Sequence, residues 1–97
     1  MVMSILEAHV AQRNWAALKQ AYDQGAQHRE AGVLQSFLVQ SINYAELWRI
    51  ITIWSSREAL DETRKAGRVQ PGVQIFRSAH AEPILMVFEI AQHVAAQ

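Results

Sequence analysis

The stretch LWRIITIWSSREALDETRKAG, from Leu47 to Gly67, joins two kinds of sequence without a linker. Its first eight residues are branched or aromatic, which is typical of a β-strand. Charged residues and alanine follow a pair of serines, which indicates a helix. Ser55 and Glu58 have the spacing of a capping box, in which each side chain bonds the other residue's backbone amide. Gly67 is the expected C-terminal glycine of this helix. The strand therefore leads directly into the helix, and the cap forms the junction.

The flanking segments predict three more strands and one more helix. Residues 2–10 (VMSILEAHV), 33–41 (VLQSFLVQS) and 84–94 (ILMVFEIAQHV) are rich in aliphatic and β-branched residues, which favours strands. Residues 14–30 predict a helix that begins at Asn14 as N-cap, because their apolar residues recur at spacings of three and four. Residues 68–83 predict a loop with a turn at Pro71 and Gly72, and VQIF at 73–76 is a candidate for a short extra strand.

This order of elements predicts an α+β fold of the ferredoxin-like βαββαβ type, in one domain that spans residues 1–97. Right-handed connections place both helices on one face of a four-stranded antiparallel sheet with strands in the order fourth, first, third, second. The other face is left uncovered. It is expected to carry Met3, Ile5, Phe37, Ile51, Ile53 and Val87 or their neighbours. Because 51% of the residues are hydrophobic, we expect a homodimer formed by sheet-to-sheet packing.

Charge and cysteine content exclude several classes of function. Nine basic and nine acidic residues cancel, so the field that draws proteins to nucleic acid or to a membrane surface is missing. With no cysteine there is neither a disulfide nor a thiolate site. No segment is apolar for the length of a membrane span, and the first ten residues lack a basic leader. A cytoplasmic protein is the expectation.

The chain resembles the dimeric α/β barrel proteins of the antibiotic biosynthesis monooxygenase type. The resemblance is carried by VMSILEAHVA at 2–11, by WRIITIWSSREALDETR at 48–64 and by AEPILMVFEI at 81–90. In that family the third strand typically ends in Trp-x-Ser and runs into a helix that starts with a charged pair and alanine, and IWSSREAL matches. The resemblance implies a dimeric barrel and, for the family's oxygenases, oxidation of aromatic molecules without metal or flavin.

The family also contains haem-degrading enzymes, and the sequence departs from their pattern. Those enzymes are associated with an asparagine on the first strand and with a tryptophan and a following histidine on the second helix. The first strand here offers Glu7 and His9 instead, and REALDETRKAG has neither tryptophan nor histidine. We therefore expect no haem chemistry and no cofactor.

Aromatic residues are the candidates for substrate binding. Trp48 and Trp54 differ by an even number of positions, so they point to the same face of their strand. Trp15 and Tyr22 lie on the apolar stripe of the first predicted helix. If the strand face is the helix-covered one, these four rings line a pocket in which flat aromatic substrates stack. The alternative is that they fill the core, as Trp54 would where strand meets helix.

Polar residues on neighbouring strands are the candidates for catalysis. Glu7 and His9 share a face of the first strand, and Arg49 of the third strand is expected on the same sheet face. A histidine beside a carboxylate can act as a general base near neutral pH, so we predict a catalytic set of His9, Glu7 and Arg49. The alternative is that these groups form ion pairs within the barrel. A metal site made by His9, Glu89 and His93 has no supporting spacing, so no metal is predicted.

Two functions follow from these candidates. The first is a cofactor-independent monooxygenase that acts on a small aromatic or quinol-like molecule. The second is a non-catalytic ligand-binding or assembly protein of the same fold. A pocket with a base near the ligand favours the first function. A pocket filled by Trp15, Trp54 and Tyr22 themselves favours the second.

Overall fold

The computed structural model describes residues 1–27, 30–65 and 71–95. Four strands form the sheet: β1 (Val2–His9), β2 (Val33–Gln40), β3 (Leu47–Trp54) and β4 (Ile84–Glu89). The helices are a short 3-10 turn, η1 (Gln12–Asn14), followed by α1 (Trp15–Ala26), α2 (Arg57–Lys65) and α3 (Pro71–Ser78). Among the described residues, no helix is long and apolar enough to cross a membrane.

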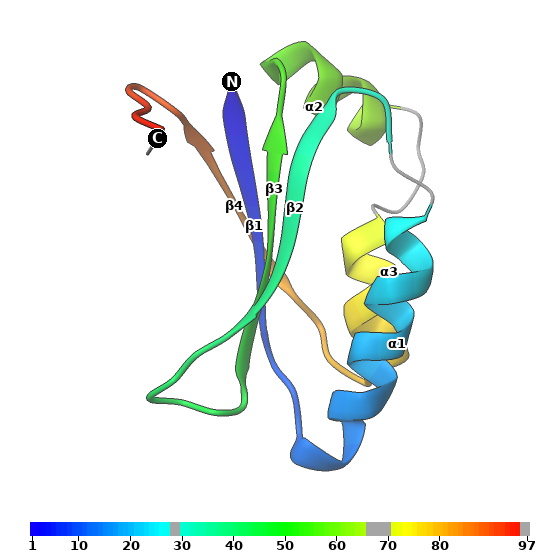
Figure 1. Ribbon diagram of the computed structural model, residues 1–97. Coiled ribbons are helices and arrows are strands. Elements are labelled where there is room, and N and C mark those ends of the chain that lie inside the picture. The colour runs from blue at the N-terminus through cyan, green and yellow to red at the C-terminus, as the bar shows by residue number, and fades with distance from the viewer. Residues whose placement is uncertain (28–29, 66–70, 96–97) are drawn as a thin grey trace.

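The strands form one antiparallel sheet in the order β2-β3-β1-β4, which confirms the predicted ferredoxin-like topology (Figure 1). α1 and α3 lie side by side over one face, and α2 lies at the end of the sheet where β3 finishes. β2 and β3 are consecutive in the chain and form a hairpin. The register of β2 shifts between Val33 and Gln35, so Leu34 is an extra residue that forms a bulge.

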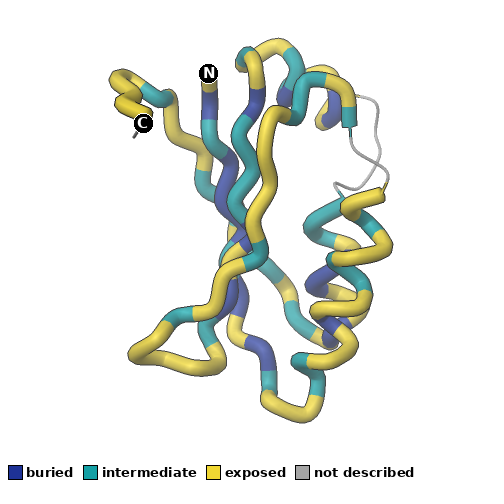
Figure 2. Tube along the Cα trace, in the orientation of Figure 1, coloured by how far each residue is buried: buried dark blue, intermediate teal, exposed yellow. Residues whose placement is uncertain are grey.

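The two faces of the sheet differ in exposure, and Figure 2 shows that the buried residues of the sheet belong to the inner strands β1 and β3. The helix-covered face is buried and consists of alternate residues of these strands: Val2, Ser4, Leu6, Ala8, Trp48, Ile50 and Trp54. The opposite face, which we call the open face, is covered by none of the described helices. One row across it joins Phe37, Ile51, Ile5 and Met86 from all four strands. Val87 pairs with Ser4 and so lies on the helix-covered side, whereas its neighbours Met86 and Phe88 lie on the open face.

The prediction of a loop with a short strand at residues 73–76 is wrong, because α3 occupies Pro71–Ser78. Proline is favoured at the first position of a helix, where its missing amide proton costs nothing. Ile75, Phe76 and Ala79 are buried in the core, and Phe76 is fully covered. Gly72 allows the helix to approach the sheet, since a Cβ there would lie 2.5 Å from Leu6 Cδ1.

The N-terminus of α2 is capped by Ser56 and not by Ser55, and the predicted capping box does not form, because the residue three positions after Ser56 is Ala59 and has no side-chain acceptor. The backbone amide of Ala59 donates to Ser56 Oγ at 3.1 Å. Ser55 ends the strand instead, and its amide donates to the carbonyl oxygen of Gly32 at 2.8 Å. Asn14 precedes α1 as predicted but forms no side-chain capping bond. Gly67 lies outside the described residues.

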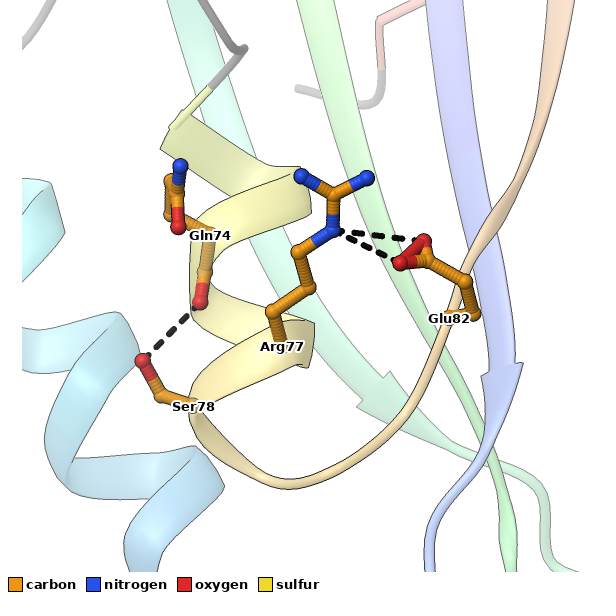
Figure 3. A network of polar contacts seen from close by, with 4 residues as sticks. All are labelled: Gln74, Arg77, Ser78 and Glu82. Atoms are coloured by element: carbon orange, nitrogen blue, oxygen red, sulfur yellow. Dashed lines mark hydrogen bonds and ion pairs between the residues drawn. The ribbon is translucent and has the colours of Figure 1, made fainter.

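The C-terminal end of α3 is tied to the segment that leads into β4 (Figure 3). Arg77 Nε donates to Glu82 Oε1 at 2.7 Å, and Ser78 Oγ donates to the carbonyl oxygen of Gln74 at 2.9 Å. The hydrogen bond to Glu82, and then the charge of this carboxylate, raise the pKa of Arg77 above its usual value. Arg77 is charged at neutral pH in any case, so the pair acts as a surface tether that solvent screens.

Gly32 has a backbone conformation that only glycine adopts easily. Its φ is +88°, and a Cβ at this position would lie 2.5 Å from the Cβ of Ala59. The start of β2 is therefore in close contact with α2, and this contact leaves no space for a side chain.

Replacement of Ser56 by alanine should lower the free energy of unfolding by about 1 kcal/mol, because it removes the acceptor that caps α2. Ser55→Ala is the matched control and should change stability much less. Urea unfolding followed by circular dichroism measures both variants. A larger loss in Ser55→Ala would show that the cap is at position 55 after all.

Gly32→Ala should destabilise the fold by about 2 kcal/mol or more, because left-handed backbone and the collision with Ala59 both oppose it. Adding Ala59→Gly removes the collision but not the backbone strain. The loss of stability caused by Gly32→Ala should therefore be smaller in the Ala59→Gly background than in wild type. Thermal unfolding of the four proteins tests this, and four strictly additive values would contradict the contact.

Candidate functional site

A cavity of about 340 Å³ lies between the sheet and the helices. It is bounded by the C-terminal end of α1, the N-terminal end of α3, one residue of α2 and the covered face of the sheet. Its size is at the lower end of that of ligand pockets. The lining residues on the sheet side are mainly Ser4, Leu6, Ser36, Ile50, Thr52 and Trp54, and those on the opposite side are mainly Tyr22, Gly25, Thr63, Pro71, Gly72 and Ile75.

Two of the predicted aromatic residues, Trp54 and Tyr22, line this cavity. Trp54 Nε1 donates to Ser4 Oγ at 2.9 Å, and Tyr22 Oη donates to Ser36 Oγ at 2.9 Å. Both rings are therefore held in place by a hydroxyl group on the sheet. They bound the cavity without filling it, so aromatic surface remains available to a ligand.

The other two predicted aromatic residues, Trp15 and Trp48, pack against each other and do not line the cavity. Their ring centroids are 5.8 Å apart in an edge-to-face arrangement. Trp15 Nε1 donates to the carbonyl oxygen of Val10 at 2.8 Å. Trp48 is only 3% exposed and borders an open groove between α1 and β2, and its Nε1 has no partner among the described residues. The pair therefore forms part of the core.

The residues of the predicted catalytic set lie on the open face, opposite the cavity. Glu7 and Arg49 are cross-strand partners, and Arg49 Nε and Nη2 approach Glu7 Oε1 to 2.7 and 2.6 Å. His9 is exposed and pairs with Leu47, so the strand stays regular to its end. The catalytic role of this set stays a prediction, but no atom of the three lines the cavity.

The candidate metal ligands do not converge. Glu89 pairs with Val2, which places it on the helix-covered side of β4, whereas His9 is on the open side of β1. His93 follows the strand and is exposed. Within residues 1–27, 30–65 and 71–95, no three histidine or acidic side chains are grouped as metal ligands would be.

The structure adds polar residues that the sequence interpretation missed. Among the described residues that line the cavity, Glu30 is the acidic one, and it lies in the connection before β2. Ser4, Thr52 and Ser36 supply hydroxyl groups from three adjacent strands. The sequence does carry a signal for them, because each is a polar residue at a position where alternation predicts the covered face.

Comparison with known proteins agrees with the fold. The family model for antibiotic biosynthesis monooxygenase matches residues 1–81. A search of curated proteins finds no match. Among solved structures, an antibiotic biosynthesis monooxygenase-type protein from Deinococcus radiodurans is similar with a TM-score of 0.75 and 16% identity, over 100% of this chain and 99% of that chain.

Two further solved structures extend the comparison. SnoaB, a cofactor-independent oxygenase from Streptomyces nogalater, is similar with a TM-score of 0.71 and 14% identity, over 98% of this chain and 97% of that chain. A protein of the same monooxygenase type from Bordetella bronchiseptica has a TM-score of 0.75 and 14% identity, over 94% of this chain and 97% of that chain. These identities show a shared fold, and the family match covers most of the chain. The protein belongs to the antibiotic biosynthesis monooxygenase family.

Proposed function

We propose that this protein is a cofactor-independent monooxygenase that acts on a small aromatic or quinol-like molecule bound in the cavity. The observation that carries the proposal is the unfilled volume of about 340 Å³ bounded by Trp54 and Tyr22. Flat apolar molecules are favoured there by burial and by offset stacking on the two rings. Family membership supports the reaction class, and SnoaB is an oxygenase of the same fold that works without a cofactor.

The proposed reaction needs a base and a substrate that becomes electron-rich on losing a proton. A phenolate or enolate formed in the cavity transfers one electron to O₂, and the two radicals combine at a ring carbon as a peroxide anion. This anion takes back the proton held by the base and becomes a hydroperoxide. Loss of water from a CH₂ position then leaves a ketone. One oxygen atom stays in the product, the other leaves as water, and the substrate supplies all the electrons.

Glu30 is the candidate base that the structure favours, because it is the acidic residue among those that line the cavity. His9 is the candidate from the sequence, but it lies on the open face. For His9 to act as the base, the ligand would have to bind on that face instead. The two candidates therefore place the reaction on different sides of the sheet.

We also propose that the active unit is a homodimer formed by two open faces. This face carries exposed apolar residues, among them Phe37 at 45%, Val39 at 38% and Phe88 at 50% exposure. A second sheet would cover them, and an apolar area of this extent favours association. The Glu7–Arg49 pair would then be enclosed as a matched ion pair, which avoids burial of an isolated charge.

Glu30→Gln should lower turnover by about a hundredfold, the usual effect of losing a general base. His9→Ala tests the rival base in the same assay. Oxygen uptake with a panel of anthrone- and quinol-like compounds measures both variants. A large loss in His9→Ala with normal turnover in Glu30→Gln would move the reaction to the open face.

Aromatic ligands should quench the emission of Trp54 more than that of Trp48, because only Trp54 lines the cavity. Quenching should therefore fall in Trp54→Phe and persist in Trp48→Phe. Equal quenching in both variants would remove the cavity from the proposal. Binding without oxygen uptake across the panel would favour the non-catalytic ligand-binding protein.

The protein should elute with twice the monomer mass in gel filtration with light scattering. Ile51→Lys should yield monomers, because it places a charge in the row that crosses the open face. Gln20→Lys makes a similar charge change on the exposed surface of α1 and is the matched control. A stable monomer of wild type at micromolar concentration would contradict the dimer.

A further inference from the structure

The sheet side of the cavity carries three hydroxyl groups in one row. Thr52 of β3 pairs with Ser4 of β1 on one side and with Ser36 of β2 on the other. Cross-strand partners point to the same side of a sheet, so all three side chains face the helices, and all three line the cavity. The rows before and after this hydroxyl row are apolar: Leu38, Ile50 and Leu6 form one, and Val33, Trp54 and Val2 form the other.

Ser4, Thr52 and the hydrogen-bonded pair of Ser36 and Tyr22 can each donate one proton to a ligand. An indole N–H can only donate, so Ser4 Oγ must accept from Trp54, and the proton of Ser4 is left for another acceptor. Tyr22 and Ser36 share one hydrogen bond, so one of their two protons is left over whichever group donates. Thr52 forms no side-chain hydrogen bond within the described residues. Ser4 is only 5% exposed, and a buried hydroxyl without an acceptor costs free energy.

We propose that the hydroxyl row recognises a ligand whose ring carries two oxygen atoms in the 1,4 arrangement, as a quinone or a quinol does. Neighbouring hydroxyls on adjacent strands are about 5 Å apart. The oxygens of a 1,4-quinone lie at opposite ends of one six-membered ring, a similar separation. They therefore accept from Thr52 and one of its neighbours at the same time.

The hydroxyl row also predicts that unsubstituted aromatics bind in the cavity more weakly than ring systems that carry acceptors. A hydrocarbon that fills the cavity covers these hydroxyls and supplies no acceptor, so the lost hydration is not replaced. Sites built to bond a polar group discriminate strongly against analogues that lack it. Trp54 and Tyr22 act here as positioning residues, because their own hydrogen bonds orient the serines. This inference rests on the proposed function only in placing an aromatic ligand in the cavity.

The test compares two ligands of similar shape, of which only one carries acceptors for the row. 1,4-Naphthoquinone and 1,4-dimethylnaphthalene share a fused ten-carbon skeleton, with a methyl group of the second in place of each oxygen of the first. Isothermal titration without oxygen should show that wild type prefers the quinone. Thr52→Val keeps the shape and the strand propensity, and it should weaken quinone binding about tenfold while leaving the hydrocarbon unaffected. The chain has no cysteine, so the quinone meets no thiol.

Thr63→Val is the matched control for the removal of a hydroxyl. Thr63 lines the same cavity from α2, but its Oγ1 donates to the carbonyl oxygen of Ala59 at 3.3 Å. The preference for the quinone should therefore survive in this variant. Ser36→Ala, on the exposed edge strand, is a second test of the row and should also reduce the preference.

The outcomes separate this inference from the proposed function. Equal effects of Thr52→Val on both ligands, or no effect on either, would overturn the role of the hydroxyl row. If wild type binds neither ligand, both the row and the cavity site are overturned. If wild type prefers the quinone and Thr52→Val loses this preference, the row is supported even when no oxygen uptake is found. That last result would contradict only the proposed monooxygenase activity.

Discussion

β1 occupies an inner position in the sheet, so the alternation of its side chains is fixed by two neighbouring strands at once. Its even-numbered residues meet the helices and its odd-numbered residues meet the open face. Because of this constraint, Ser4 faces the helices, and its hydroxyl accepts a hydrogen bond from the indole of Trp54. A shift of one residue in register would exchange the two faces. Ser4 would then leave the cavity, and Glu7 would turn away from Arg49.

Periodicity along the strands and the serine pair before α2 were enough to predict the strands, their order and two of the helices. The position of the cap was wrong by one residue, because Ser55 and Ser56 are equivalent in sequence and only the end of β3 distinguishes them. α3 was missed because Pro71 and Gly72 together are typical of a turn. Its stability comes from Phe76 in the core, a tertiary contact that local propensity does not include.

The candidate site was harder to predict than the fold. Parity placed Trp48 and Trp54 on one face of their strand, but it did not show which face the helices cover or which tryptophan borders the cavity. That depends on where α1 ends and where α3 begins, since Trp15 covers Trp48 whereas the ends of the two helices leave space near Trp54. Glu30 was predicted as the last residue of the first helix, whereas α1 ends at Ala26 and Glu30 lies in the connection to β2, where helical periodicity does not apply. Glu7, His9 and Arg49 were predicted as catalytic because such groups transfer protons or stabilise charge. The strand residues that line the cavity are instead all uncharged.

The bulge at Leu34 has a consequence for how this strand tolerates insertions and deletions. Val33 pairs with Trp54, and Ser36 pairs with Thr52, so both face the helices. In an uninterrupted strand, residues three positions apart would face opposite sides. The extra residue Leu34, which is 48% exposed, accounts for the difference. A homologue could lose this one residue and keep every side chain of β2 on its present face. The same loss one or two positions after Ser36 would turn the remainder of β2 over, so length variation in β2 should be confined to the bulge.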